Sequence, residues 1–203
     1  MSDGRLRVAL TIDVEHGDRP HSAGGAARLL GVLDRRGATA TFFLQGRWVT
    51  AEPSVAQRIA AGGHTIGNHS HSHVRMPQLS DAGLAAEVTE AGEAITAATG
   101  VDPAPWFRCP YGDGHDDPRV LAGLQRLGYR DVYWHVDPRD WEPGRTAADV
   151  VADVVAGVAA HGDACVVVMH SWPDVTVASL PGVLDGLELL GAEFTGLEEV
   201  CAA

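Results

Sequence analysis

The sequence predicts an α/β fold in which helices surround a closed or nearly closed barrel of parallel strands. Seven strand-like runs alternate with amphipathic helical patterns along the 203 residues. The apolar run at 165–169 (Cys-Val-Val-Val-Met) is typical of a strand buried on both faces of a sheet. Glycine follows most of the helical patterns, as expected at helix C-termini.

Each element is assigned from its own pattern: short apolar runs for strands, and a repeat near 3.6 residues for helices. The expected strands are Arg7–Val14, Ala38–Leu44, His64–Asn68, Trp106–Pro110, Asp131–Val136, Ala164–His170 and Glu193–Leu197. The expected helices are Ala26–Arg36, Ser54–Ala61, Asp81–Thr99, Pro118–Leu127, Ala147–His161 and Pro181–Leu190. No Pro/Ser-rich linker divides the chain, so we expect one compact domain over residues 1–203.

Composition excludes several classes of partner. The formal net charge is −12 and no dense Lys/Arg run occurs, so neither nucleic acid nor an anionic membrane surface is an expected partner. Three cysteines (Cys109, Cys165 and Cys201) are an odd number without a framework spacing, which suits a reducing compartment. No stretch reaches the length of a membrane span, and no signal-peptide pattern opens the sequence, so we expect a cytoplasmic protein.

Histidines are concentrated directly after the third expected strand, in the run 68–73 (Asn-His-Ser-His-Ser-His). His69 and His73 are four residues apart, so a helical turn would place both on one face, where they could bind one metal ion. Imidazole ligands suit Zn²⁺, Co²⁺, Ni²⁺ or Fe²⁺. In a β/α barrel, reactive groups gather at the C-terminal ends of the strands, and this run lies at such an end.

Two carboxylates, Asp13 and Glu15, end the first strand. Side chains two residues apart on a strand project to the same side. One of these carboxylates could ligate a metal while the other serves as a general base. A solvated acidic loop is the alternative, and the apolar strand that delivers both residues to the active end favours a site.

Three further strand ends carry candidate groups. Arg108 of the run 108–112 (Arg-Cys-Pro-Tyr-Gly) could hold a neighbouring carboxylate ionised, and a backbone N–H in this tight turn could face an oxyanion, although a surface turn is the alternative. An aspartate elsewhere on the rim could orient His170, which ends the sixth strand, for acid catalysis. Trp141 and Trp172 are either planes on which sugars stack or side chains packed in the core.

Taken in this order, the five motifs resemble those of the NodB-type polysaccharide deacetylases, carbohydrate esterase family 4, over nearly the whole chain. The resemblance implies a distorted (β/α)7 TIM-like barrel, the NodB homology domain, acting as a single catalytic domain. It also implies that Glu15, His69 and His73 are metal ligands and that Asp13 is the general base.

The resemblance assigns roles to the remaining motif residues. Arg108 would pair with the base, and the backbone N–H of Tyr111 would help to hold the oxyanion. His170 would be the general acid, tuned by Asp140. The candidate substrate contacts are Trp141, Tyr111 and Trp172.

Two positions depart from the family pattern. The usual first motif contains adjacent aspartates, whereas this chain has Asp13-Val14-Glu15, similar to a subgroup whose members include enzymes acting on other C–N bonds, some without metal. The retention of both His69 and His73 favours the metal-dependent type. Met169 replaces the usual leucine before the histidine of the fifth motif.

The expected function is therefore removal of N-acetyl groups from an amino sugar or oligosaccharide by a metal-dependent hydrolase of non-peptide amide bonds. One divalent ion is expected, with Zn²⁺ first and Co²⁺, Ni²⁺ or Fe²⁺ as alternatives. Three other functions remain open: a deacetylase of a small acetylated amide or natural-product intermediate, an O-acetyl sugar esterase, and an inactive carbohydrate-binding protein.

Overall fold

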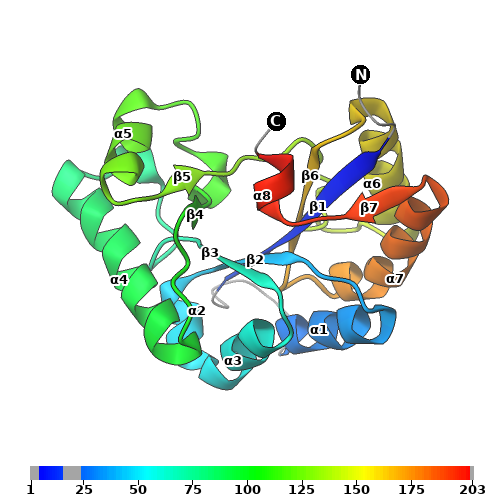
Figure 1. Ribbon diagram of the computed structural model, residues 1–203, viewed down its shortest axis with the longest axis horizontal. Coiled ribbons are helices and arrows are strands. Elements are labelled where there is room, and N and C mark those ends of the chain that lie inside the picture. Colours follow the sequence, from blue (N-terminus) through cyan, green and yellow to red (C-terminus); the bar gives the residue numbers. More distant parts are fainter. Residues whose placement is uncertain (1–4, 16–23, 202–203) are drawn as a thin grey trace. The chain divides into compact units, whose positions relative to one another are not determined.

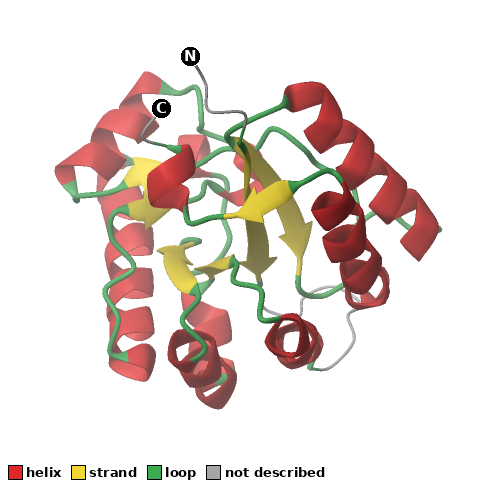
Figure 2. Cartoon of the chain, turned by 45° about the vertical axis from the view of Figure 1, so that its right-hand side comes forward, coloured by secondary structure: helices red, strands yellow, loops and turns green. Residues whose placement is uncertain are grey.

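The computed structural model describes residues 5–15 and 24–201 as an alternation of strands and helices (Figures 1 and 2). The strands are β1 (Leu6–Val14), β2 (Thr41–Leu44), β3 (Thr65–Asn68), β4 (Trp106–Phe107), β5 (Arg130–Asp131), β6 (Cys165–His170) and β7 (Ala192–Phe194). The helices are α1 (Gly25–Arg36), α2 (Gly46–Ala51), α3 (Pro53–Ala61), α4 (Asp81–Thr99), α5 (Pro118–Arg126), α6 (Ala147–His161), α7 (Asp174–Leu189) and α8 (Leu197–Val200). Two short 3₁₀ turns, η1 (Met76–Gln78) and η2 (Pro110–Gly112), complete the list.

The chain divides into two compact units. In its described part, the first unit comprises residues 5–13, 24–41 and 134–201. Its central strand β1 is flanked by β6 and β7, both parallel to it; Asp13 is in register with His170. Helices α1 and α6 both pack against α7 (Figure 1). This pairing places the ends of β1 and β6 side by side.

The second unit comprises residues 14–15 and 42–133. Its strands follow the order β5-β4-β3-β2, and β4 is parallel to both of its neighbours. Asn68 is in register with Phe107, and Phe107 with Asp131, so the residues that follow β3, β4 and β5 leave the sheet at the same edge. Helix α4 packs against α2, α3 and α5.

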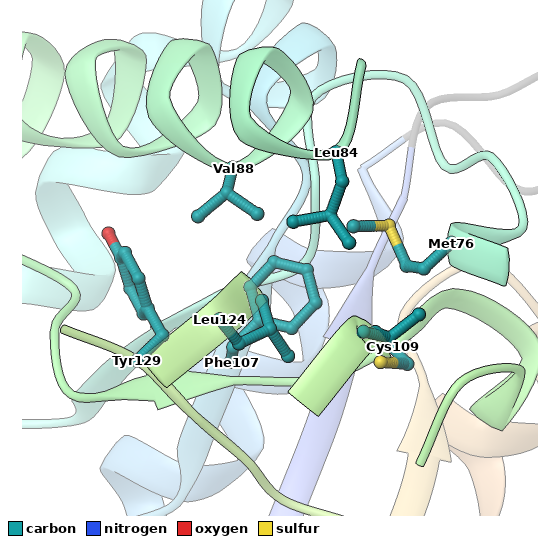
Figure 3. Close-up of a cluster of buried hydrophobic side chains, with 8 residues drawn as sticks. Met76, Leu84, Val88, Phe107, Cys109, Leu124 and Tyr129 are labelled. Carbon is teal, nitrogen blue, oxygen red and sulfur yellow. The ribbon is translucent and has the colours of Figure 1, made fainter. Parts of the chain in front are cut away.

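A buried apolar cluster fixes α4 on the sheet of the second unit. Figure 3 shows Leu84 and Val88 on the inner face of α4, pointing toward Phe107 of β4. The cluster is completed by Met76, Cys109, Val120, Leu124 and Tyr129. Burying a side chain of this size contributes about 1.5–3 kcal/mol to folding. The orientation of α4, and of any polar group that it carries, is therefore set by the core.

Helices α4 and α6 have the bounds that the sequence predicts, because each has capping residues at both ends. The Ser80 hydroxyl accepts the Gly83 N–H at the start of α4, and Thr146 and Asp149 form a capping box at the start of α6. Gly100 ends α4 in the left-handed region. No helix in the described part of the chain is both long enough and apolar enough to cross a membrane.

Other boundaries correct the sequence prediction. Strand β5 covers two residues rather than Asp131–Val136, and Val136 forms only an isolated parallel bridge with Val167. Helix α7 begins at Asp174, so Pro181 lies inside it and not at its first turn. Its buried side chains, from Thr176 to Leu187, form one continuous face, and this packing outweighs the hydrogen bond that proline cannot donate. Helices α2 and α8 were not predicted.

Candidate active site

Glu15, His69 and His73 meet at one point of the second unit. Their ligand atoms all lie within 4.8 Å of one another. Oε1 of Glu15 is 3.1 Å from Nε2 of His73 and 3.8 Å from Nε2 of His69. Glu15 and His69 are buried. One carboxylate and two imidazoles in this arrangement form the three-ligand set typical of catalytic zinc sites.

A backbone hydrogen bond fixes the orientation of the His69 ring. Its Nδ1 lies 2.9 Å from the carbonyl oxygen of Arg108. Because a carbonyl only accepts, Nδ1 carries the proton, and in the neutral ring Nε2 presents a lone pair. That lone pair lies on the side of the Glu15 carboxylate. Two electron-rich atoms held this close favour a cation between them. A metal-binding histidine usually donates its other ring N–H to a hydrogen-bond acceptor, as His69 does here to the Arg108 carbonyl.

The histidines meet through a different local structure from the expected helical turn. Residues 69–75 are irregular, and Ser70 (φ 60°) and His73 (φ 59°) adopt the left-handed region. The Ser70 hydroxyl accepts the N–H of His73, and the Asn68 side-chain carbonyl accepts the N–H of Ser70. The prediction that His69 and His73 approach each other is thus confirmed, whereas the helical reason given for it is wrong.

A second cluster, His135, His161 and Cys165 of the first unit, also brings its ligand atoms within 4.8 Å. The two imidazole rings are stacked, with centroids 4.0 Å apart and planes at 22°. Nδ1 of His135 accepts the N–H of Val166, so the neutral ring carries its proton on Nε2. Burial raises the pKa of the Cys165 thiol to about 11. The hydrogen bond from Val166 occupies the Nδ1 lone pair of His135, so the structure shows a stacked imidazole pair in which that ring is a poor metal ligand.

The turn after β4 places Arg108 beside His69 and Tyr111 beside His73. Arg108 is buried; its Nε donates to the Val132 carbonyl, and its guanidinium lies over the Phe43 ring. Tyr111 has left-handed dihedrals (φ 61°, ψ 9°), and its ring lies 4.5 Å from the ring of His73. Non-glycine residues rarely adopt this left-handed conformation, and those that do often belong to functional turns. The pairing of Arg108 with the base stays a prediction.

In the first unit, Asp140 fixes His170. Oδ1 of Asp140 lies 2.7 Å from Nδ1 of His170, and Oδ2 accepts the His170 backbone N–H at 2.8 Å. The hydroxyl of Thr176 donates to the same Oδ2. Asp140 is buried, so the carboxylate is held by protein donors rather than by water. This arrangement aims Nε2 of His170 away from the aspartate.

The remaining predicted residues of the first unit lie near that pair. Asp13 is buried at the end of β1, where its carbonyl accepts the N–H of Ser171. The Trp172 ring is 6.2 Å from the His170 ring and is half-buried, whereas Trp141 is exposed. Exposure of Trp141 fits the stacking interpretation better than the core interpretation.

Two residues close to the His170 pair were given no role by the sequence interpretation. Asp137 accepts the N–H of Arg139 at 2.7 Å, and burial raises its pKa, with the Arg139 N–H and the Trp141 side chain opposing that shift. An aspartate bonding two residues ahead in Asp-Pro-Arg is a recognisable turn signal. Thr176, in contrast, leaves no local signal, because its partner Asp140 is 36 residues away.

Comparison with known proteins relates these motifs to one family. The polysaccharide deacetylase family matches residues 2–132. A chitooligosaccharide deacetylase of Rhizobium leguminosarum bv. trifolii is 34% identical over 169 residues, which cover 83% of this chain and 73% of that protein. A peptidoglycan-N-acetylglucosamine deacetylase of Listeria monocytogenes is 31% identical over 194 residues, covering 96% of this chain and 38% of that protein. The chain therefore spans well under half of the Listeria protein.

Solved structures agree. A family 4 carbohydrate esterase from Streptomyces lividans in complex with acetate superposes with a TM-score of 0.82 at 28% identity, covering 96% of this chain and 93% of that one. A family 4 pseudoenzyme from Bacillus anthracis gives 0.85 at 26% identity, covering 97% and 65%. These likenesses confirm the predicted fold class, the distorted (β/α)7 TIM-like barrel. By its matching residues and by its fold, the chain belongs to the polysaccharide deacetylase family, carbohydrate esterase family 4.

Proposed function

We propose that this protein is a metal-dependent hydrolase that removes N-acetyl groups from an amino sugar or a short oligosaccharide. The convergence of Glu15, His69 and His73 supports the proposal most directly. The relatives named above as deacetylases of chitooligosaccharide and of peptidoglycan N-acetylglucosamine support the substrate class. The prediction of a single catalytic domain over residues 1–203 belongs to the same proposal.

The donor set fits a divalent ion. Glu15, His69 and His73 would hold it, and the lone pair of His69 already faces the carboxylate. When bound, such an ion supplies Lewis acidity for an acyl oxygen and for water. Zn²⁺ is the ion we expect first, with Co²⁺, Ni²⁺ or Fe²⁺ as alternatives, because all accept imidazole ligands.

The proton-transfer roles follow from the family resemblance. Asp13 accepts the proton of the attacking water, and His170 donates a proton from Nε2 to the leaving nitrogen. Without that donation the amine would leave as an anion, which is a very poor leaving group. Asp140 supports the donor because its carboxylate faces the opposite edge of the imidazolium and stabilises its charge.

The turn at Tyr111 supplies the remaining elements of the proposal. Its backbone N–H helps to hold the oxyanion of the tetrahedral intermediate, and Arg108 orients the base. The exposed side chains of Tyr111 and Trp141, together with Trp172, contact the sugar ring. Aromatic planes suit this task because a sugar presents an apolar face to them.

The test is a substrate panel. Protein reconstituted with Zn²⁺, Co²⁺, Ni²⁺ or Fe²⁺ is incubated with N-acetylated mono- and oligosaccharides, O-acetyl sugars and small acetylated amides, and released acetate and free amine are measured. Acetate with a stoichiometric amine from the N-acetyl sugars is the expected result. The double variant His69→Ala/His73→Ala, prepared in the same way, is the control. Release only from small amides or only from O-acetyl sugars would move the assignment to that class, and sugar binding without hydrolysis would indicate a binding protein.

A further inference from the structure

Glu87, on helix α4, accepts three hydrogen bonds from the loop that carries the histidines. Its Oε2 accepts the backbone N–H groups of His71 (3.0 Å) and Ser72 (2.8 Å), and its Oε1 accepts the Ser72 hydroxyl. Glu87 is half-buried and lies 15 residues from Ser72 in sequence. Hydrogen bonds to an ionised carboxylate are about twice as strong as neutral ones. This one side chain therefore holds the middle of the loop between His69 and His73.

The loop has no helical or sheet ladder of its own to keep its shape. Ser70 and His73 adopt left-handed dihedrals, which are unfavourable for non-glycine residues and persist only where the surroundings impose them. On one side, the N–H groups of Gly46 and Arg47 donate to the carbonyls of Ser70 and His71. Glu87 holds the other side of the loop, because it accepts the N–H groups of His71 and Ser72, which point away from α2.

Helix α4 is a rigid support for this carboxylate. Leu84 and Val88 are buried against Phe107 (Figure 3), and Ala91 is buried as well. Leu84 and Ala91 lie three residues before and four residues after Glu87, so all three share one side of the helix. The core that fixes α4 consequently fixes the position of the carboxylate.

We propose that Glu87 is a positioning residue for the metal centre. By holding the loop, it keeps the Nε2 atoms of His69 and His73 turned toward Glu15, so that a metal ion meets a preformed set of ligands. This inference rests on the proposed function, because it presumes that the three residues bind a metal. Groups that orient metal ligands in other proteins typically change metal affinity by about 10–100-fold when they are removed.

The experiment measures metal binding rather than turnover. Zn²⁺ affinity is determined by chelator competition for the wild type, Glu87→Ala, Glu87→Gln, Ser72→Ala and the exposed control Glu90→Ala on the same helix. We expect Glu87→Ala to bind Zn²⁺ about 10–100-fold more weakly. Glu87→Gln should lie measurably between that variant and the wild type, because an amide still accepts both N–H groups but lacks the charge. Ser72→Ala should show a small loss, and Glu90→Ala none.

A second readout reports ligand geometry. The visible spectrum of the Co²⁺-loaded protein depends on the arrangement of ligands, so Glu87→Ala should shift its bands while Glu90→Ala leaves them in place. A folded Glu87→Ala with wild-type affinity and spectrum would overturn the inference. If Glu87→Ala does not fold, wild-type affinity in Glu87→Gln would overturn it instead. Absence of Zn²⁺ binding by the wild type is a distinct result, because it would remove the proposed metal centre itself.

Discussion

The Asp140 carboxylate contacts both the backbone N–H and the imidazole ring of His170. One carboxylate oxygen lies 2.7 Å from Nδ1 of the ring, and the other accepts the backbone N–H at 2.8 Å. The backbone contact fixes where the carboxylate lies, and the ring contact fixes how the imidazole is turned. The acid proposed for the reaction is thereby oriented by a single buried group.

Replacing Asp140 by asparagine should lower kcat by about 10²–10⁴-fold, the usual contribution of a positioned proton-transfer group. The amide oxygen can keep the bonds from the His170 N–H and from Thr176, but the amide NH₂ then faces Nδ1 and requires that atom to be deprotonated. The protonated imidazole needed for acid catalysis is disfavoured. Steady-state kinetics check this, with Thr176→Val as a milder variant that removes one donor to the same carboxylate. Near-normal turnover in Asp140→Asn would contradict the role.

The variants Asp13→Asn and His170→Ala should each reduce turnover by about 10²–10⁴-fold while keeping their metal. Neither residue belongs to the cluster of ligand atoms formed by Glu15 and the two histidines. Turnover and metal content are measured on the same preparations. Loss of metal from Asp13→Asn would reassign Asp13 from base to ligand.

Removing the histidine ligands should abolish metal binding. In His69→Ala/His73→Ala, metal analysis should fall from about one ion per chain, the content of a three-ligand catalytic site, to background. His71→Ala is the matched control, because His71 lies between the two ligands in sequence and is absent from the cluster. Full metal content in the double variant would remove this site from the proposal.

The sequence predicted well those features whose causes are local. Helix α4 has the predicted bounds because the Ser80 cap and the Gly100 terminator are neighbours of the residues that they cap. Apolar runs likewise located β1 and β6 to within one residue. Several candidate site residues could be anticipated on the same basis, since Asp13 and His170 lie at the ends of β1 and β6, and Glu15 and His69 follow β1 and β3 directly.

The features that the sequence did not predict depend on distant partners. Pro181 was taken as the first turn of a helix, where proline is favoured, yet the packed face of α7 extends the helix back to Asp174. The spacing of His69 and His73 suggested a helical turn, whereas contacts from Gly46, Arg47 and Glu87 hold an irregular loop. None of these contacts leaves a periodic signal in the sequence.

The ion pair between Arg7, near the N-terminal end of β1, and Asp163 should make the stability of the fold depend on pH. Hydrogen bonds from the side chain and the backbone N–H of Arg7 hold the pKa of Asp163 well below its usual range. A depressed folded-state pKa stabilises the protein above the unfolded-state value, near 3.9, and the contribution is lost as pH falls below it. Urea midpoints of the wild type and Asp163→Asn should therefore differ most near pH 7, and the difference should shrink steadily as the pH falls below about 4. Asp116→Asn, at a side chain that is 84% exposed, is the control. A difference that does not shrink at low pH would contradict this explanation.

Substrate length should have little effect beyond the first one or two sugars. Among the residues that the structure describes, the exposed aromatic side chains are Tyr111, Tyr133 and Trp141, which are 47%, 41% and 40% exposed. A groove with many sugar subsites needs a longer row of such planes, because each stacked ring requires its own surface. We therefore expect kcat/KM to rise from mono- to disaccharide and then level off through the hexasaccharide, with specificity determined by contacts near the acetyl group. Trp141→Ala should lower kcat/KM by a similar factor for every chain length if Trp141 contacts the sugar that loses its acetyl group. A steady increase in kcat/KM up to the hexasaccharide would contradict a site that binds only one or two sugars, while leaving the proposed deacetylation intact.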